Sequence, residues 1–259
     1  MAVLAPTALP DRVRRASDLA RDRVAGGPNR VLPVAPELRP LLPALRRGST
    51  VAVAPGTSSL VLALIAPASA AGAWVAVVGM PGFGALAAAQ AGVVWERLAL
   101  VPHPEPEWGT VVATLLDGFD IVVTVPPGPV APRLAGRLAA RARQRGSVLV
   151  PYGRWEGAEL TLTAGQGAWE GLGAGHGRLR RRELTITARG RGAAGRPRQV
   201  RVTLPDAAGR LGPARPATRP APTQPAPAWV AAGQRAATRT GRPDLTLIPG
   251  TGERAVRRA

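Results

Sequence analysis

Five short apolar segments, separated by segments with helical spacing, constrain the fold of this chain more than any other feature. They are TVAVA at 50–54, WVAVVGM at 74–80, LALVP at 98–102, DIVVTV at 120–125 and SVLVPY at 147–152. Helices are predicted between them, beginning near residues 58, 84, 107 and 131. Strands that alternate with helices in units of this length require parallel crossovers. We therefore expect an α/β fold with a mainly parallel sheet and helices on both faces.

The first half of this region contains no charge, because no charged residue occurs between Arg47 and Glu96. Glycines and prolines divide it into pieces of strand or helix length, which excludes a membrane span there. Uncharged strands are typical of a parallel sheet that is covered on both faces. The N-terminal sequence MAVLAPTALPDRVRR lacks the long apolar run of a secretory signal. We expect a cytoplasmic protein without a membrane contact.

Two further regions flank the core, which we place at residues 38–204. Residues 1–37 combine a predicted helix, Leu9 to Val24, with an extended, proline-rich lead-in. The apolar stripe of this helix, which includes Val13, Ala16 and Ala20, could dock on its own core or on a partner. Residues 205–259 carry repeated proline, alanine and arginine without periodicity. This tail is expected to be disordered, with Trp229 as a candidate partner contact.

The end of the core has a different texture from its beginning. AELTLTA at 158–164, RELTITARG at 182–190 and RQVRVTLP at 198–205 alternate apolar and polar residues with period two. This alternation predicts an antiparallel extension of the sheet.

The turn after the first strand has the layout of a phosphate-binding loop but lacks its chemistry. Such a loop uses glycines to direct backbone N–H groups at phosphates, a lysine to neutralise them and Ser or Thr to hold Mg²⁺. Here the turn offers only Gly56, and Thr57 stands where the lysine would fall, followed by Ser58 and Ser59. The whole chain contains no lysine. We interpret the turn as a degenerate P-loop and expect no nucleotide cofactor.

Carboxylates are also missing where nucleotide chemistry would need them. In open α/β sheets ligands bind at the carboxyl ends of the strands. The strand DIVVTV ends in Thr124 and Val125, with Asp120 at the opposite end, and WVAVVGM leads to Met80 and Pro81. The chain has no cysteine, and its two histidines, His103 and His176, are far apart, which argues against a metal site. We expect a protein that is not an enzyme.

Arginine is the most prominent candidate for binding chemistry, because all 34 basic residues are arginine and the net charge is +18. Such an excess suggests an acidic partner. A dense run surrounds a predicted strand and a glycine-rich turn, and it could neutralise phosphates without reading sequence. It could equally meet an acidic protein or form a solvated face. Its members are Arg178, Arg180, Arg181, Arg182, Arg189, Arg191, Arg196, Arg198 and Arg201.

The order of these segments resembles the RecA core over residues 38–204. LLPALRRGSTVAVAPGTSSLVLALI is similar to the strand, P-loop and helix that begin that core, and GFDIVVTVPPG is similar to the strand that carries the Walker B aspartate. AAQAGVVWERLALVPHPEPEW, GSVLVPYGRW and AELTLTA are similar to other RecA segments. The positions of both DNA-binding loops are short in this chain, with PPGPVAPRLAG and GRWEG in their place.

A RecA-like core that lacks these parts, with an arginine-rich segment and a Pro/Ala/Arg tail, resembles the ImuA-type proteins of the actinobacterial mutasome. The resemblance implies a non-catalytic adaptor in the SOS response to DNA damage. Its partner would be an ImuB-type inactive Y-family polymerase homologue and, through it, an error-prone replicative-type DNA polymerase that performs translesion synthesis. The protein would then be cytoplasmic and associated with the nucleoid when DNA is damaged.

Three other functions remain open from the sequence. One is an ATPase with an unorthodox site around Thr57 and Ser58, and another is a damage-induced cell-division inhibitor, since such inhibitors include small degenerate RecA-like proteins. The third is an arginine-rich protein that binds DNA non-specifically.

Overall fold

The computed structural model describes residues 31–173, 176–190 and 195–214. The predicted N-terminal helix with Val13 and Ala20, the tail beyond Ala214 with Trp229, and Arg191 lie outside these described residues.

The predicted parallel sheet is present. Its four strands run in the order β5-β4-β6-β7 and are all parallel. The strand that precedes the degenerate P-loop, β3 (Val51–Val53), continues this sheet beside β7 through parallel bridges from Thr50 to Leu149 and from Val53 to Tyr152. The other bounds are β4 (Val75–Val78), β5 (Leu98–Val101), β6 (Ile121–Thr124) and β7 (Val148–Pro151).

Antiparallel strands extend the sheet on the other side of β3, as the period-two segments predict. The order there is β12-β11-β10-β8-β3, and β9 pairs with β10. The pairing of β8 with β3 is parallel, so β8 is where the sheet changes direction, while β10 is antiparallel to β8, β9 and β11. The bounds are β8 (Leu160–Ala164), β9 (Ala168–Gly173), β10 (His176–Gly190), β11 (Arg198–Thr203) and β12 (Gly212–Pro213).

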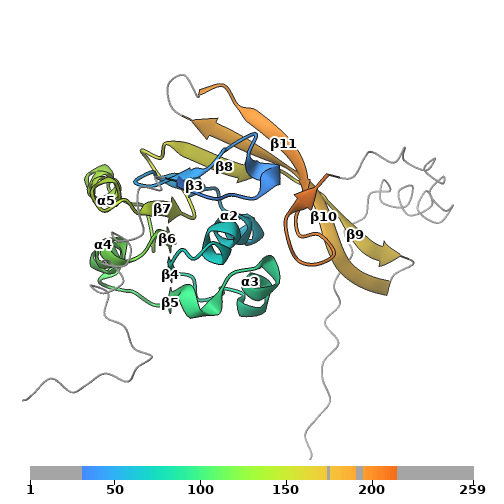
Figure 1. The fold of residues 1–259 in the computed structure, drawn as a ribbon, viewed down its shortest axis with the longest axis horizontal. Helices are drawn as coiled ribbons and strands as arrows, with labels where there is room; N and C mark the ends of the chain where they lie inside the picture. The colour runs from blue at the N-terminus through green and yellow to red at the C-terminus, as the bar shows by residue number, and fades with distance from the viewer. Residues whose placement is uncertain (1–30, 174–175, 191–194, 215–259) are drawn as a thin grey trace, which may run out of the picture. The chain divides into compact units, whose positions relative to one another are not determined.

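Helices cover both faces of the parallel strands, with α2 and α3 on one face and α4 and α5 on the other (Figure 1). A hydrophobic core lies on each face of the sheet, and successive side chains of a strand point into the two cores in turn. Val75 and Val77 of β4 pack on the α2 side, and Ala76 and Val78 pack on the α4 and α5 side. Every residue of β4, β6 and β7 is therefore buried. The bounds are α2 (Ser58–Ala70), α3 (Ala85–Ala91), α4 (Trp108–Gly118) and α5 (Pro132–Arg145), and η2 (Trp95–Arg97) precedes β5.

The antiparallel strands are covered on one face only. Leu184, Ile186 and Ala188 of β10 belong to the core on the α2 side. The residues between them, Thr185 and Thr187, lie on the opposite face, which carries polar side chains and no helix among the described elements.

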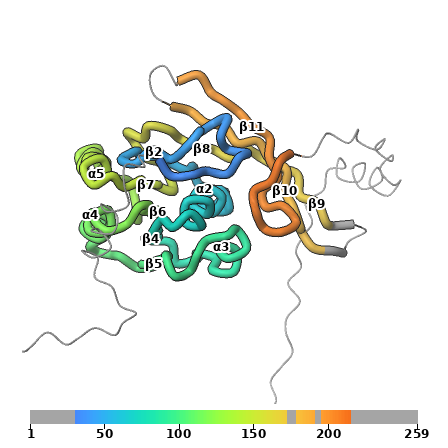
Figure 2. The backbone as a smooth tube through the Cα atoms, viewed as in Figure 1, coloured from blue at the N-terminus to red at the C-terminus, as the bar shows by residue number. Residues whose placement is uncertain are grey.

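The lead-in before the first predicted strand belongs to the folded core, although the sequence suggests only an extended connection. It forms a short antiparallel pair, β1 (Val31–Leu32) with β2 (Leu45–Arg46), and a 3₁₀ turn, η1 (Pro36–Leu38). Leu38, Leu41 and Leu45 are almost completely buried. The leucines between the prolines thus anchor this segment, which is drawn in blue at the start of the coloured tube in Figure 2.

Pro205 does not mark the end of the fold, in contrast to the boundary predicted from composition. Residues 205–214 continue as a tight loop followed by β12, which pairs with β11 through Val202 and Thr203. The Asp206 carboxylate accepts hydrogen bonds of 2.8 Å from the backbone N–H groups of Ala208 and Arg210, which closes the loop.

Candidate functional site

The loop after β3 stands at the position of a P-loop, at the carboxyl ends of the parallel strands. Gly56 is exposed, with a φ of 104°, and its N–H group donates a hydrogen bond of 3.0 Å to the hydroxyl oxygen of Tyr152. Thr57 is buried as the residue that precedes α2, Ser58 is exposed and Ser59 is half-buried. A backbone N–H group that a P-loop would direct at phosphate is thus already paired with a side chain.

The end of β6, where a RecA-like ATPase would carry its metal-binding aspartate, is filled by aromatic packing. Thr124 is fully buried, and its Oγ1 accepts a hydrogen bond of 2.9 Å from Nε1 of Trp108. The ring of Trp108 meets that of Trp155 edge-on, with centroids 6.4 Å apart. Both tryptophans are buried, so this strand end is an apolar contact between α4 and the segment after β7.

The end of β4 is closed by its neighbour in the sheet. Gly79 follows this strand with a φ of 74°, and a Cβ atom there would lie 2.5 Å from the carbonyl oxygen of Val125. Only glycine fits this approach, which brings the segments after β4 and β6 into contact. Met80 and Pro81 come next, in place of a carboxylate that could activate water.

Asp120 has a structural role at the amino end of β6, on the opposite edge of the sheet. Its Oδ1 lies 2.6 Å from Nη1 of Arg47, and its Oδ2 accepts a hydrogen bond of 2.8 Å from the backbone N–H of Trp74. The carboxylate thus joins the lead-in to two neighbouring strands. His103, Glu105 and Glu107, in the loop before α4, are exposed.

The first four arginines of the predicted cluster lie within β10 itself, on the arm that pairs with β9, rather than around a glycine-rich turn. Arg178 and Arg180 are exposed. Arg181 forms an ion pair with Glu170 of β9, and the guanidinium of Arg182 lies 5.7 Å from the ring centroid of Trp169. Two of the four therefore hold the hairpin together, and two are available to a ligand.

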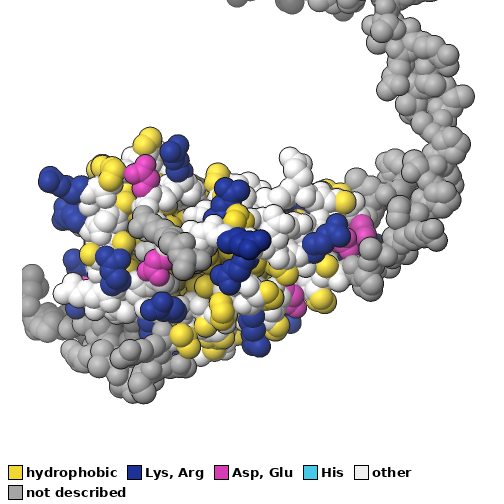
Figure 3. Space-filling view, turned by 90° about the horizontal axis from the view of Figure 1, so that it is seen from above, with side chains coloured by type: hydrophobic (Ala, Val, Ile, Leu, Met, Phe, Trp, Pro, Cys, Tyr) yellow, Lys and Arg dark blue, Asp and Glu magenta, His cyan; other side chains and the backbone are white. Residues whose placement is uncertain are grey.

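The remaining arginines do not join these four in one patch. Arg189, Arg196 and Arg201 are exposed, whereas Arg198 donates a hydrogen bond of 2.6 Å to the carbonyl oxygen of Leu41 and so fastens β11 to the lead-in. Figure 3 shows arginine side chains scattered over the face seen from above, among polar and apolar atoms. The arginines therefore lie farther apart in the fold than their closeness in the sequence suggests.

Three residues that sequence reasoning missed define these sites. Tyr152 holds the Gly56 N–H, Trp108 holds the Thr124 hydroxyl, and Trp169 lies exposed beside Arg182 on the hairpin. Tyr152 directly follows β7 and Trp108 begins α4, but only the fold shows which polar group each one meets.

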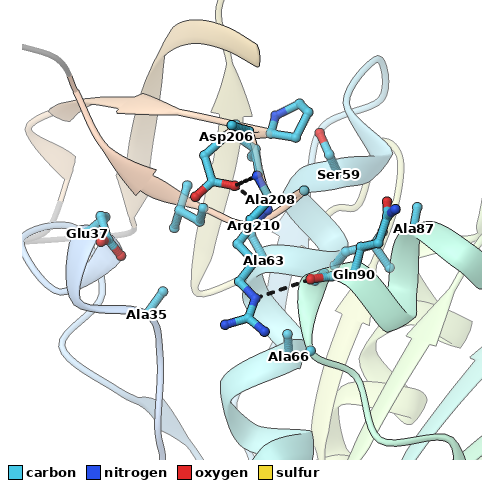
Figure 4. A pocket seen from close by; sticks show the side chains of 18 of the residues that line it. Ala35, Glu37, Ser59, Ala63, Ala66, Ala87, Gln90, Asp206, Ala208 and Arg210 are labelled. Atoms are coloured by element: carbon cyan, nitrogen blue, oxygen red, sulfur yellow. Dashed lines mark hydrogen bonds between the residues drawn. The ribbon is translucent and has the colours of Figure 1, made fainter. Parts of the chain in front are cut away.

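A hollow on the described surface lies between α2, α3, the lead-in and the 205–211 loop (Figure 4). Its volume is about 1230 Å³. Ala63 and Ala66 of α2 form part of its wall, Arg210 extends into it, and Nε of Arg210 donates a hydrogen bond of 3.3 Å to the carbonyl oxygen of Gln90. We call this hollow the α2–α3 groove. It is not at the carboxyl ends of the parallel strands.

The described residues form neither a metal-binding cluster nor a membrane-spanning helix. Among residues 31–173, 176–190 and 195–214, no three His, Cys, Asp or Glu side chains lie close enough together to hold a metal ion. Within the same part of the chain, no helix has the length and apolar character needed to cross a membrane.

Comparisons with known proteins agree with this architecture. The chain is similar to the crystal structure of the RadB recombinase with a TM-score of 0.52 and 15% sequence identity, over 70% of this chain and 97% of that one. The fold is therefore RecA-like. The family model described as the MT3502 N-terminal domain matches residues 40–157. The uncharacterized protein Rv3395c of Mycobacterium tuberculosis is 38% identical over 156 residues, which make up 60% of this chain and 74% of the relative. This chain therefore belongs to the same family as Rv3395c.

Proposed function

We propose that this chain is a non-catalytic, RecA-like adaptor of the DNA-damage mutasome, of the ImuA type. It would bind an ImuB-type inactive Y-family polymerase homologue and, through it, an error-prone replicative-type polymerase. The observation that carries the proposal is the replacement of nucleotide chemistry by packing: Tyr152 pairs with the Gly56 N–H, and Trp108 pairs with Thr124. A RecA-like fold with its strand ends filled in this way keeps its outer surfaces, which an adaptor uses to bind partners, without the groups needed for nucleotide chemistry.

The proposal assigns the principal partner contact to the tail after Ala214, which carries Trp229. Tryptophan and arginine are the residues most enriched where binding energy concentrates in protein interfaces, and the tail supplies both. A segment that becomes ordered on binding can cover a large surface of its partner. The protein would act in the cytoplasm and reach the nucleoid through this complex when DNA is damaged.

Co-purification tests this proposal. The full chain is expressed with the ImuB-type protein of the same genome, beside Trp229→Ala and, as a matched control, Trp95→Ala, which removes an exposed tryptophan of the described part. We expect a stoichiometric complex with the full chain and the control, and a weaker one with Trp229→Ala. The absence of a complex with the full chain at moderate salt would refute the adaptor function.

The competing ATPase reading makes the opposite prediction for nucleotide. With the Gly56 N–H occupied and no lysine in the chain, we expect no saturable binding of ATP with Mg²⁺ by calorimetry. Saturable micromolar binding that is lost on substitution of Thr57 or Ser58 would establish the ATPase reading instead.

A second candidate, non-specific DNA binding, is favoured by the exposed Arg178 and Arg180 of β10 and by the exposed Trp169 of the paired strand β9. Guanidinium groups neutralise phosphates, and an exposed indole can stack on an unpaired base. Arg178→Glu with Arg180→Glu should then weaken binding of single-stranded DNA and flatten its dependence on salt. Arg133→Glu with Arg137→Glu, on the exposed side of α5, changes the net charge equally and serves as the control. Equal losses of DNA affinity in both double variants would mean that only the net charge of the protein matters, and not the position of Arg178 and Arg180.

A further inference from the structure

We propose that the α2–α3 groove is the docking site of this chain's own N-terminal segment, the predicted helix from Leu9 to Val24. Beyond the adaptor function, this assigns Val13 and Ala20 to an intramolecular contact. The argument rests on the chemistry of the groove, on the point where the segment joins the described fold and on the match between the two surfaces.

The groove borders a helix whose composition suits a buried position. Residues 58–70 of α2 contain no charged side chain, and nine of its thirteen residues are buried. A helix that is apolar on all sides is normally covered on all sides. Yet Ala63, Ala66, Pro67 and Ala70 line an open hollow, together with Ala87 and Ala91 of α3. Ala63 and Ala66 are buried, whereas Pro67 is half-buried and Ala70 is exposed, so this side of α2 is open toward the C-terminal end of the helix.

The volume of the groove argues for a polypeptide occupant. At about 1230 Å³ it is larger than the roughly 300–1,000 Å³ of ordinary small-molecule pockets. Its wall is formed mostly by small apolar side chains, with Glu37, Asp206 and Arg180 among the charged residues that line it. Alanines on facing helices allow two backbones to approach closely, so this wall suits a helix with a small-residue stripe.

The N-terminal segment joins the described fold beside the groove. The described chain begins at Val31, and the residues that follow it, Val34 to Glu37, line the groove themselves. Only residues 25–30, AGGPNR, separate the predicted helix from β1. Six residues can span up to about 20 Å when extended, which permits the helix to reach the groove within the same chain. A segment tethered this closely has a high effective concentration at the site.

The stripe of the predicted helix matches the wall of the groove. At 100° per residue, Leu9, Val13, Ala16, Ala20 and Val24 fall within an arc of about 80°. The stripe is narrow and consists of small and medium side chains, as the alanine wall requires. Asp11, Asp18 and Asp22 lie on the opposite side of the helix, where they would remain in water when the stripe is buried.

Cross-linking tests the docking directly, because the chain has no native cysteine. A short bis-maleimide is applied to the full chain with Ala20→Cys and Ala87→Cys, the latter an exposed position in the groove. The matched control pairs Ala20→Cys with Ala140→Cys, an exposed alanine of α5 on the other side of the parallel strands. We expect a link within one chain for the first pair and little for the second. Equal yields overturn the proposal, and links mainly between two chains identify a second copy as the occupant.

Limited proteolysis provides a second, independent test of the docking. Trypsin cleaves after the arginines of the predicted helix, and its rate follows the population of the undocked segment when undocking is fast. Ala87→Arg places a long cation in the groove, whereas Ala89→Arg changes an exposed residue of the same helix that does not line it. We expect cleavage before residue 25 to accelerate about tenfold in Ala87→Arg, as for a loss of about 1.4 kcal/mol, and to stay unchanged in Ala89→Arg. Wild-type rates in both variants contradict the docking.

Discussion

The indole Nε1 of Trp108 donates a hydrogen bond of 2.9 Å to Oγ1 of Thr124, and both side chains are buried at the carboxyl end of β6. Sixteen residues separate them in the sequence, and the pair joins the first turn of α4 to the strand that follows this helix. A position that serves chemistry in nucleotide-binding sheets contributes to packing here. The stability of the fold should therefore respond to changes at this strand end.

Removing the Thr124 hydroxyl should destabilise the protein. Thr124→Val keeps the shape of the side chain but leaves the buried Trp108 N–H without its acceptor, at a cost of about 1–2 kcal/mol in the free energy of unfolding. Urea denaturation measures the loss. Thr114→Val, at an exposed threonine of α4, is the control and should change the free energy by less than about 0.5 kcal/mol. Equal effects would show that the buried hydrogen bond adds nothing.

Asp120 should matter for stability and not for any ligand. Asp120→Ala removes the acceptor of the Trp74 N–H and the partner of Arg47, and we expect a loss of about 2–4 kcal/mol. Asp120→Asn keeps one acceptor oxygen for the Trp74 N–H and should lose less. Urea denaturation of both variants distinguishes the roles: equal losses would mean that the charge contributes everything.

Asp117 should make stability depend on acid pH. Hydrogen bonds from Arg141, together with the charges of Arg141 and Arg145, hold the pKa of the Asp117 carboxyl below its ordinary value of 3.8. A pKa lowered by folding contributes stability that is present above the ordinary pKa and is lost as the pH falls through the folded pKa. The groups are partly exposed, so the contribution is only about 0.2–1 kcal/mol.

Arg141→Gln measures this contribution as a difference from the wild type. The difference in unfolding free energy should be present at pH 7, shrink below pH 3.8 and decrease in high salt. A difference that stays constant down to pH 2.5 would assign the effect of Arg141 to packing of its aliphatic stem.

The segment after Pro205 should stabilise the core. A chain that ends at Leu204 loses β12, the half-buried Leu211 and the hydrogen bond of 3.1 Å from Thr203 Oγ1 to the Pro213 carbonyl. We expect it to be less stable than a chain that ends at Ala214 by about 1–2 kcal/mol. Thermal unfolding of the two chains provides the comparison, and identical midpoints would contradict a role for this segment in the fold.

The strands and helices of the core could be predicted because each has a periodicity of its own. Residues 75–78 are apolar at every position and residues 121–124 at all but the last, Thr124, as is typical of strands covered on both faces. The β9 strand was missed because AWEGLG has no alternation, and it is held by its pairing with the arginine-rich strand β10. The prolines of the lead-in and of residues 205–214 suggest chain outside the fold. The leucines near these prolines pack into the core and so hold both segments in the fold.

The sequence was enough to exclude nucleotide chemistry at the strand ends. It was not enough to predict the side-chain contacts that occupy these positions instead. A missing lysine or aspartate is visible in the residues themselves. The contacts from Tyr152 to Gly56 and from Trp108 to Thr124 join residues that only the folded sheet brings together. The scatter of the arginines has the same cause, because Arg178 and Arg198 lie on different strands and meet different neighbours.

The strand β10 takes part in two kinds of pairing along its fifteen residues. Near Arg181 it pairs with β9 in the hairpin arm, and from Ile186 to Ala188 it lies between β8 and β11 with its apolar side chains in the core. Its backbone amides should therefore exchange with solvent at rates that fall steadily from the arm to the core. A ligand held by Arg178 and Arg180 would slow amide exchange in the arm of β10. Because the same strand continues into the centre of the sheet, exchange of the core amides of β10 would slow as well.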